Sequence, residues 1–317
     1  MDIPSLESII EAHRRIKPFV HRTPVMTSSR INSISGAEIY FKCENFQKVG
    51  AFKFRGATNA VLQLKEQNVK EVITHSSGNH AAALALAAKM AGMKARIVMP
   101  RTAPAVKINA VRDYGAEITF CEPTQQAREQ TTRILMEKTG AILVHPYDNF
   151  NVICGQGTAA LELLEEIGDT EIVMAPVGGG GLLSGTSIAV KGVNRNIKVY
   201  GAEPRNADDA YRSFTTGVLH PSVSPKTIAD GLLTSLSELT FAIIRKNADN
   251  IFTVTEESII EAMRLIWERM KIIVEPSSAV TLAVIMENPD VFRGKKTGII
   301  LSGGNVELTR LPFTQLS

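Results

Sequence analysis

The chain has 317 residues, of which 44% are hydrophobic and 21% charged, and its formal net charge is +3. This composition is typical of a globular protein with enough apolar side chains for a full core. Lys and Arg are scattered along the chain rather than clustered, which argues against nucleic-acid binding. The apolar stretch at residues 81–88 is broken by Lys89 and is too short to span a membrane.

The cysteines and the N-terminus indicate the cellular compartment. The three cysteines, Cys43, Cys121 and Cys154, are far apart and lack the spacing of metal ligands, as is typical of a reducing environment. Residues 1–5 contain no basic segment that leads into an apolar one, so we expect no signal peptide. These features predict a cytoplasmic protein.

Segments typical of strands and of helices alternate along the chain. Strand-like apolar runs occur at residues 38–42, 71–74, 95–99, 117–120, 172–177, 198–202 and 297–301. Helix-like patterns occur between them at residues 81–90, 107–114, 125–139, 182–190 and 257–270. This alternation predicts an α/β protein with largely parallel sheets, of one large or two medium domains, and no linker marks a boundary.

Three loops rich in small or polar residues each follow a predicted strand. They cover residues 76–80, 178–181 and 302–305. Ligands of parallel sheets bind in crevices beyond the carboxyl ends of the strands. We therefore expect these three loops to line one shared crevice.

Four consecutive glycines, Gly178, Gly179, Gly180 and Gly181, separate a predicted buried strand from a predicted helix. Glycine N–H groups can approach a ligand closely, and at a helix N-terminus they favour an anion such as a phosphate. A flexible turn is the alternative, although one glycine would be enough for it. A dinucleotide site is a further alternative, but no Gly-x-Gly-x-x-Gly pattern fits this run.

Lys53 lies between Phe52 and Phe54. Aromatic neighbours can remove hydration from a lysine and lower its pKa toward the neutral amine that Schiff-base chemistry requires. The alternative is a surface lysine on an amphipathic helix.

Taken together, these motifs identify a family. Residues 48–56 (KVGAFKFRG), Ser76–His80 (SSGNH), the tetraglycine with Leu182, and Ser302–Asn305 (SGGN) occur in the same order as in fold-type II enzymes that use pyridoxal 5′-phosphate. Among these the chain resembles the serine racemase and serine/threonine dehydratase family, over residues 23 to 305. The resemblance implies a two-lobed, parallel-sheet-rich fold like that of the tryptophan synthase β subunit. It also implies a large cofactor domain of residues 1–66 plus 148–317, and a smaller substrate-closing domain of residues 67–147.

The resemblance implies a role for each motif residue. Lys53 would hold the cofactor covalently, Phe52 would stack near its ring, and Asn79 would bond its 3′ oxygen. The backbone of Gly178, Gly179, Gly180, Gly181 and Leu182 would cradle its phosphate, and Ser302 would face the pyridine nitrogen. A serine hydroxyl cannot keep this nitrogen protonated as a carboxylate would, so the ring would be a weaker electron sink that favours loss of a β-substituent.

The same resemblance implies the residues that act on the substrate. Lys53 would take the Cα proton as a general base, and Ser77 would act on the opposite face during racemisation. The alternative for Ser77 is a helix N-cap. Ser76, Ser77, Asn79 and His80 would bind the substrate through loop and helix N-terminal donors. Arg128 would also contact the substrate, although a helix-surface arginine is equally compatible with its position.

A metal, an effector and a partner are also implied. Glu203, the carbonyl of Ala207 and Asp209 would bind Mg²⁺, or Mn²⁺ or Ca²⁺, since hard cations prefer oxygen ligands. A solvated acidic loop is the alternative. Some relatives bind ATP at a subunit interface, and a partial match to that pattern is formed by Ser28, Ser29, Lys48, Tyr114 and Asn305, with Val49 in place of a polar residue. We also expect a homodimer.

The expected activity is serine racemisation accompanied by dehydration of serine to pyruvate and ammonia. The basis is Ser77 together with the predicted metal ligands. A dedicated ammonia-lyase for L-threonine or threo-3-hydroxyaspartate is the alternative, because hydroxyaspartate lyases can share both features. A non-catalytic binding protein is a further alternative, which the intact Lys53 opposes.

Overall fold

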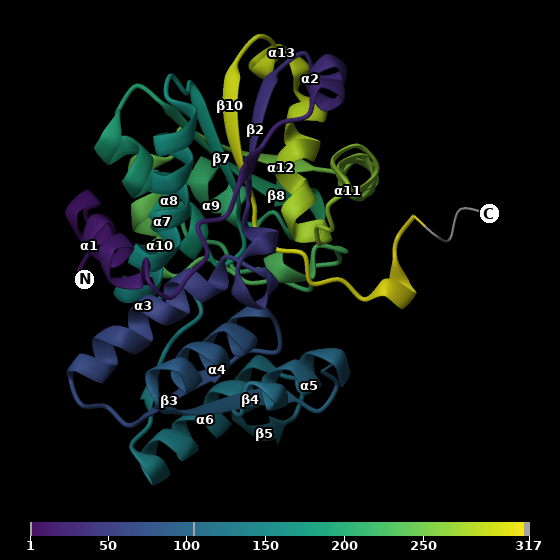
Figure 1. The fold of residues 1–317 in the computed structure, drawn as a ribbon. Helices are drawn as coiled ribbons and strands as arrows, with labels where there is room; N and C mark the ends of the chain where they lie inside the picture. The colour runs from purple at the N-terminus through teal and green to yellow at the C-terminus, as the bar shows by residue number, and fades with distance from the viewer. Residues whose placement is uncertain (1, 104, 314–317) are drawn as a thin grey trace.

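The computed structural model describes residues 2–103 and 105–313, which form two β-sheets (Figure 1). The larger sheet has the strand order β1-β2-β10-β7-β8-β9 and the smaller one β5-β4-β3-β6. Every pair is parallel except β1 with β2. The prediction of an α/β protein with largely parallel sheets is confirmed. The strands are β1 Val25–Met26, β2 Glu38–Cys43, β3 Glu71–His75, β4 Lys94–Pro100, β5 Glu117–Cys121, β6 Ile142–Leu143, β7 Ile172–Pro176, β8 Lys198–Pro204, β9 Asn250–Val254 and β10 Lys296–Leu301.

Helices cover both faces of the larger sheet. Helices α1, α7, α8 and α10 pack on one face, and α11 and α12 pack on the other (Figure 1). Among the described residues, none of the helices is both long and apolar enough to cross a membrane. The helices are α1 Leu6–Ile16, α2 Ser29–Ser35, α3 Lys53–Glu66, α4 Asn79–Ala91, α5 Ala105–Asp113, α6 Gln125–Thr139, α7 Phe150–Ile167, α8 Gly181–Val193, α9 Asp209–Thr216, α10 Glu238–Asn247, α11 Glu256–Met270, α12 Pro276–Glu287 and α13 Pro289–Phe292.

Strand β7 illustrates why the central strands read as continuous apolar runs. Successive side chains of a strand point to opposite faces of the sheet. Ile172 and Met174 pack with α11 and α12, whereas Val173 and Ala175 pack with α7 and α8. Because both faces are covered, neither set can be polar.

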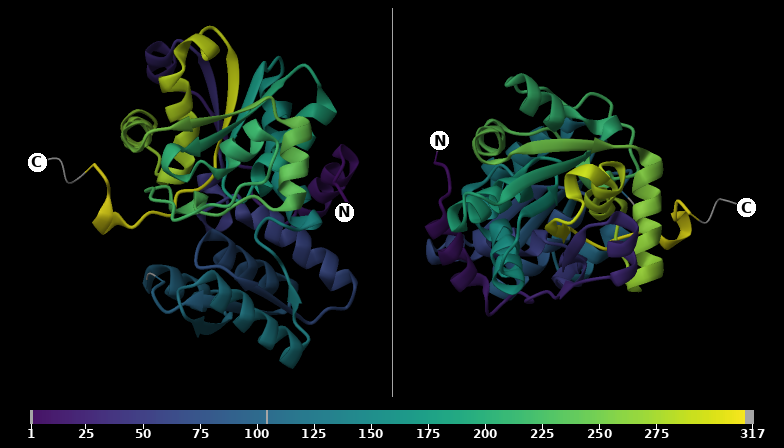
Figure 2. Two further views of the ribbon diagram at one scale, coloured as in Figure 1. Left: turned by 180° about the vertical axis from the view of Figure 1, so that it is seen from behind. Right: turned by 90° about the horizontal axis from the view of Figure 1, so that it is seen from above.

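The smaller sheet and helices α4, α5 and α6 form a lobe beside the larger sheet, which Figure 1 and the left view of Figure 2 show below the main body. All four of its strands lie between residues 71 and 143. Helix α3 packs against α7 of the main body and α4 of the smaller lobe. Helix α1 and the C-terminal segment lie on opposite sides of the main body (Figure 2).

Candidate active site

Lys53 is the first residue of α3, and the loop after β10 holds it in place. The Phe52 N–H donates to the Ser302 carbonyl at 3.0 Å, and Ala51 forms an isolated β-bridge with Gly303. The Lys53 amine donates to the carbonyl oxygen of Pro146 at 2.8 Å. Two of the segments that the sequence singled out, the Lys53 segment and the Ser302 loop, therefore lie side by side.

The environment of the Lys53 amine favours its neutral form. Burial lowers the pKa of Lys53 to about 8, and the Glu275 carboxylate acts in the opposite direction. Only one flanking aromatic faces the amine: Nζ lies 5.1 Å from the centre of the Phe52 ring. Phe54 is fully buried in the core of the smaller lobe. The lysine is half-buried, and its amine is held by the Pro146 carbonyl rather than free on a helix surface.

The tetraglycine lies between β7 and α8, and the helix begins at Gly181. Gly180 is the N-cap, with a left-handed φ of 85° that suits glycine, and no described side chain caps the helix. A Cβ on Gly179 would collide with the ring of Tyr147, and one on Gly180 would lie 2.6 Å from Leu236. The first N–H groups of α8 are thus left available at a site with no room for side chains, which suits a bound anion.

Ser302 follows β10 and is almost fully buried. Its hydroxyl lies 3.1 Å from the hydroxyl of Ser278, which also donates to the Gly303 carbonyl at 2.6 Å. This short network fixes the loop after β10. Ser278 is a contact that the sequence reasoning missed.

Asn79 meets a buried carboxylate that the sequence reasoning also missed. Its Nδ2 lies 3.1 and 3.2 Å from the two oxygens of Glu275, and its Oδ1 accepts from Asn305 at 2.9 Å. Burial raises the pKa of Glu275 to about 7, with a further contribution from Asp230. The one available signal was a single acid in the apolar stretch before Pro276.

The Ser76–His80 loop connects β3 to α4. Its Gly78, not Ser77, is the N-cap of α4, so the alternative interpretation of Ser77 as a helix cap is wrong. Ser76 accepts from the Gly78 N–H at 3.3 Å, which shapes the turn. His80 is buried, its Nε2 lies 3.0 Å from the Val144 carbonyl, and burial lowers its pKa to about 3. The neutral His80 ring is therefore fixed in the first turn of α4.

Arg128 lies in α6 at the side of the smaller sheet. It is half-buried, and its charge, together with burial, lowers the pKa of His75, which directly precedes the Ser76 loop. The His75 ring packs edge-on against His145, and His145 packs edge-on against Tyr147. The charge of Arg128 thus reaches His75, and a contact between Arg128 and the substrate stays a prediction.

Comparison with known proteins identifies the chain. Residues 16–303 match the family described as "Pyridoxal-phosphate dependent enzyme". The chain belongs to this family. It is 53% identical over 312 residues to a serine racemase of Dictyostelium discoideum, covering 97% of this chain and 96% of the relative. It is 49% identical to a beta-hydroxyaspartate dehydratase of Paracoccus denitrificans, covering 99% and 100%. The crystal structure of the Dictyostelium serine racemase superimposes with a TM-score of 0.92, covering 96% and 99%. The predicted family and its two-lobed fold are confirmed.

The residues around Lys53 fit the cofactor of this pyridoxal-phosphate family. The amine of Lys53 has a lowered pKa, as covalent attachment to an aldehyde requires. The tetraglycine offers uncapped N–H groups to a phosphate. Ser302 is uncharged, as expected of the residue that would face the pyridine nitrogen in a cofactor acting as a weaker electron sink.

The predicted metal ligands Glu203 and Asp209 are both buried, so the alternative of a solvated acidic loop is wrong. Both Glu203 oxygens accept backbone N–H groups at the start of α9, from Ala210 at 3.0 Å and Tyr211 at 2.8 Å. Neither Asp209 oxygen has a hydrogen-bond partner in the part of the chain that the structure describes, and burial raises its pKa to about 6. Within residues 2–103 and 105–313, no three His, Cys, Asp or Glu side chains form a metal cluster. A cation at this site would therefore also need the backbone carbonyl oxygen of Ala207, or water, as a ligand.

The residues predicted to bind ATP do not all lie at one place in the structure. Tyr114 and Asn305 line one cavity of about 400 Å³, together with Val49 and Lys107. The lining residues do not include Ser28, Ser29 or Lys48. Ser28 caps α2, and Lys48 donates to the Phe19 carbonyl at 2.6 Å.

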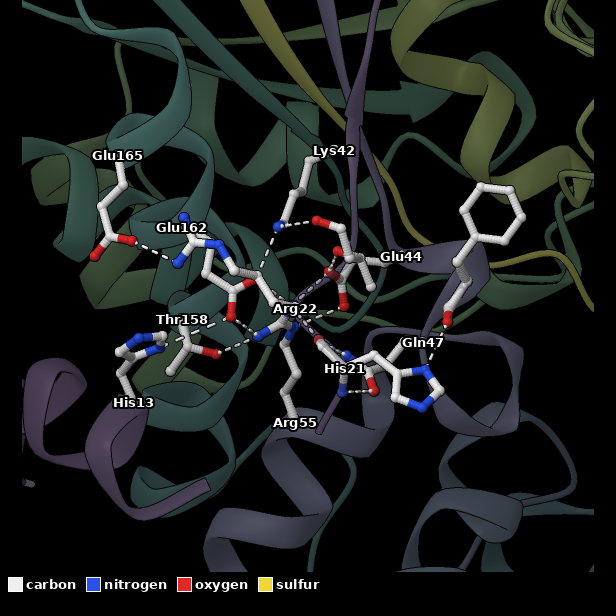
Figure 3. Close-up of polar contacts among 12 residues, drawn as sticks. His13, His21, Arg22, Lys42, Glu44, Gln47, Arg55, Thr158, Glu162 and Glu165 are labelled. Carbon is white, nitrogen blue, oxygen red and sulfur yellow. Dashed lines mark hydrogen bonds and ion pairs between the residues drawn. The ribbon is translucent and has the colours of Figure 1, made fainter. Parts of the chain in front are cut away.

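A buried ion network around Arg55 was not predicted (Figure 3). The Arg55 guanidinium pairs with Glu44 at 2.7 Å and with Glu162 at 2.7 Å, and Lys42 pairs with Glu162 at 2.7 Å. The two positive and two negative side chains are all buried. Because Arg55 is two residues after Lys53, the network anchors the first turn of α3.

Proposed function

We propose that this protein is a serine racemase that interconverts L- and D-serine and also dehydrates serine to pyruvate and ammonia. The observation that carries the proposal is the Lys53 amine, which has a lowered pKa and lies near enough to His80, at the start of α4, for its charge to add to burial in lowering the His80 pKa. The serine-containing segment directly precedes this helix. The likeness to relatives named serine racemase supports it.

The site residues would hold the cofactor at several points. When bound, pyridoxal phosphate withdraws electrons and makes the Cα proton of an amino acid acidic. Lys53 would hold it through the amine, and the backbone of residues 178–182 would hold its phosphate. Phe52, Asn79 and Ser302 would fix the ring.

Two side chains would then move protons. The substrate amine would take the place of the Lys53 amine on the cofactor, and the freed, neutral Lys53 Nζ would take the Cα proton from one face of the substrate. The Ser77 hydroxyl delivers a proton to the other face, which inverts the configuration. If the β-hydroxyl leaves as water before a proton is returned, the result is dehydration. Ser76, Asn79, His80 and the N-terminus of α4 would hold the substrate carboxylate.

An ammonia-lyase for threo-3-hydroxyaspartate is the second candidate. It is favoured by Arg128, whose charge acts on His75 beside the Ser76 loop and could receive a second carboxylate. A relative named beta-hydroxyaspartate dehydratase supports the same activity. An L-threonine ammonia-lyase remains the other lyase alternative.

We also propose that Glu203, Asp209 and the carbonyl of Ala207 bind a divalent cation, Mg²⁺, Mn²⁺ or Ca²⁺. Two buried carboxylates close together are unfavourable without a positive charge. The unpartnered oxygens of Asp209 support this proposal.

Regulation and assembly are further parts of the proposal. The cavity lined by Tyr114, Asn305 and Lys107 has a volume of about 400 Å³, and a nucleotide such as ATP would take the Lys107 ammonium from Asp230, its partner at 2.7 Å. A homodimer is supported by Phe46 and Ile273, two exposed apolar side chains on segments joined by the Asn45–Ile273 hydrogen bond.

Two broader expectations complete the proposal. Residues 67–147, which contain the smaller sheet, would move as a domain that closes on the substrate. A cytoplasmic location is supported by the three cysteines, all of which are free and buried.

The test is a side-by-side assay of the purified enzyme with L-serine, D-serine, L-threonine and threo-3-hydroxyaspartate. We expect interconversion of the serine enantiomers together with formation of pyruvate. Turnover of threo-3-hydroxyaspartate or threonine alone, with no D-serine from L-serine, would replace the proposed function by the lyase alternative.

A further inference from the structure

Helix α7 lies between the two helices that carry the anchoring points for the cofactor. Lys53 begins α3, and the tetraglycine leads into α8. Helices α3 and α8 both pack against α7. A change in how closely α7 packs against α3 or α8 would therefore change the distance between Lys53 and the tetraglycine.

The contact between α7 and α3 is made backbone to backbone. A Cβ on Gly155 of α7 would lie 2.5 Å from the carbonyl oxygen of Arg55 and 2.7 Å from the Cα of Gly56. Only a glycine permits this approach. The contact point is two residues from Lys53, and the Arg55–Glu162 ion pair ties the same two helices together (Figure 3).

The contact between α7 and α8 is built in the same way two residues later. A Cβ on Gly157 would lie 2.7 Å from the carbonyl oxygen of Gly185, and a Cβ on Gly185 would lie 2.6 Å from the Gly157 nitrogen. Residues two apart on a helix point about 200° away from each other, so Gly155 and Gly157 face opposite neighbours. Gly185 is one turn after the tetraglycine.

Gln156, between these two glycines, fills the space between the anchoring points. A Cβ on Gly181 would lie 2.8 Å from the Gln156 Oε1, and a Cβ on Gly56 would lie 3.0 Å from the Gln156 Cγ. The side chain is fully buried, and neither of its polar atoms has a partner among the described residues. Burying an amide without hydrogen-bond partners costs free energy. We therefore attribute the presence of Gln156 to its position between α3 and α8.

We propose that the Gly155-Gln156-Gly157 segment of α7 is a spacer that fixes the distance between the Lys53 amine and the N–H groups of the tetraglycine. The inference rests on the cofactor site proposed above. A ligand held at two points gains affinity only if both points match its length. The spacer residues are thus positioning residues, because they act through Lys53 and the glycines rather than on the reacting atoms.

The test compares three probes on the full chain freed of cofactor. Pyridoxal tests the Lys53 end, inorganic phosphate tests the tetraglycine, and pyridoxal phosphate tests both together. For Gly157→Ala and Gly155→Ala we expect pyridoxal phosphate affinity to fall at least about tenfold, with less than about twofold change for the two partial probes. Gly192→Ala, the same substitution in α8 against the side chain of Leu6, is the matched control and should leave all three affinities unchanged.

Equal losses for all three probes, or unchanged pyridoxal phosphate binding in a folded variant, would overturn the proposal. A second measurement uses the unmodified protein, in case the variants do not fold. A pyridoxal phosphate analogue with one extra methylene before the phosphate should bind at least about tenfold more weakly, and equal binding would overturn the spacer. Failure of the proposed function is seen separately, as absent turnover of amino acids by the cofactor-loaded wild-type enzyme.

Discussion

The Asn79 side-chain nitrogen lies within hydrogen-bond distance of both carboxylate oxygens of Glu275, at 3.1 and 3.2 Å. Glu275 also raises the pKa of Lys53 against the effect of burial. One buried carboxylate thus orients a residue proposed to bind the cofactor and stabilises the charged form of the lysine.

Replacing Glu275 should change the titration of Lys53. In Glu275→Gln the negative charge is lost, so the pKa of Lys53 should fall below its value of about 8 and the amine should be neutral at lower pH. The measurement is the pH dependence of Lys53 acylation in the cofactor-free protein, followed by mass spectrometry. A midpoint that stays in place or moves to higher pH would contradict this electrostatic role.

The buried network around Arg55 should matter more for stability than exposed ion pairs. Arg55→Met leaves the Glu44 and Glu162 carboxylates buried without their main partner, which should lower the free energy of unfolding by about 3–5 kcal/mol. Arg22→Met is the control, because Arg22 and Glu165 are both about half exposed and their pair should contribute less than about 1 kcal/mol. Urea unfolding of both variants checks this, and equal effects would count against the network.

The proposed cation site predicts a stability response to metal. Mg²⁺ at about 100 times its dissociation constant should stabilise the folded protein by about 2.7 kcal/mol, and a chelator should reverse the effect. Asp209→Asn should remove the response, whereas Asp208→Asn, next to it in sequence and paired with Arg212, should retain it. Thermal unfolding with and without Mg²⁺ is the measurement. The same response in both variants would rule out Asp209 as a ligand.

Covalent attachment at Lys53 has a direct readout. Borohydride treatment of the loaded enzyme should add the cofactor mass to the peptide that contains Lys53, and Lys53→Ala should show no such addition. The variant should fold normally, since within residues 2–103 and 105–313 the amine donates one hydrogen bond, to the Pro146 carbonyl. Its turnover of serine should fall at least about 10³-fold. Cofactor mass on a different lysine would contradict the assignment.

Local patterns were sufficient to predict much of the fold. The continuous apolar run before the tetraglycine became β7, because both of its faces are covered by helices. Helix α4 was predicted to begin at residue 81 but begins at Asn79. Its N-cap is Gly78, which has no side chain to mark the start of the helix in the sequence. A Ser directly before Gly-Asn-His could not reveal by itself which residue would cap the helix.

The contacts that were not predicted join residues far apart in the sequence, which no local sequence pattern can indicate. Arg55 and Glu162 are 107 residues apart, and Asn79 and Glu275 are 196 residues apart. Phe54 was expected to flank the amine, but the helical geometry of α3 turns it into the core of the smaller lobe. The motif order identified the crevice, whereas the groups that tune it are brought together only by the tertiary fold.

The racemase assignment depends most directly on Ser77, because a lyase needs a base on one face of the substrate and a racemase needs groups on both. The decisive measurement is the rate of D-serine and of pyruvate formation from L-serine by the wild-type enzyme and by Ser77→Ala. We predict that the variant loses D-serine formation by about 10²-fold or more while its pyruvate formation stays within a few fold of the wild-type rate. An equal loss of both products, or continued D-serine formation, would contradict the assignment of two bases to this site.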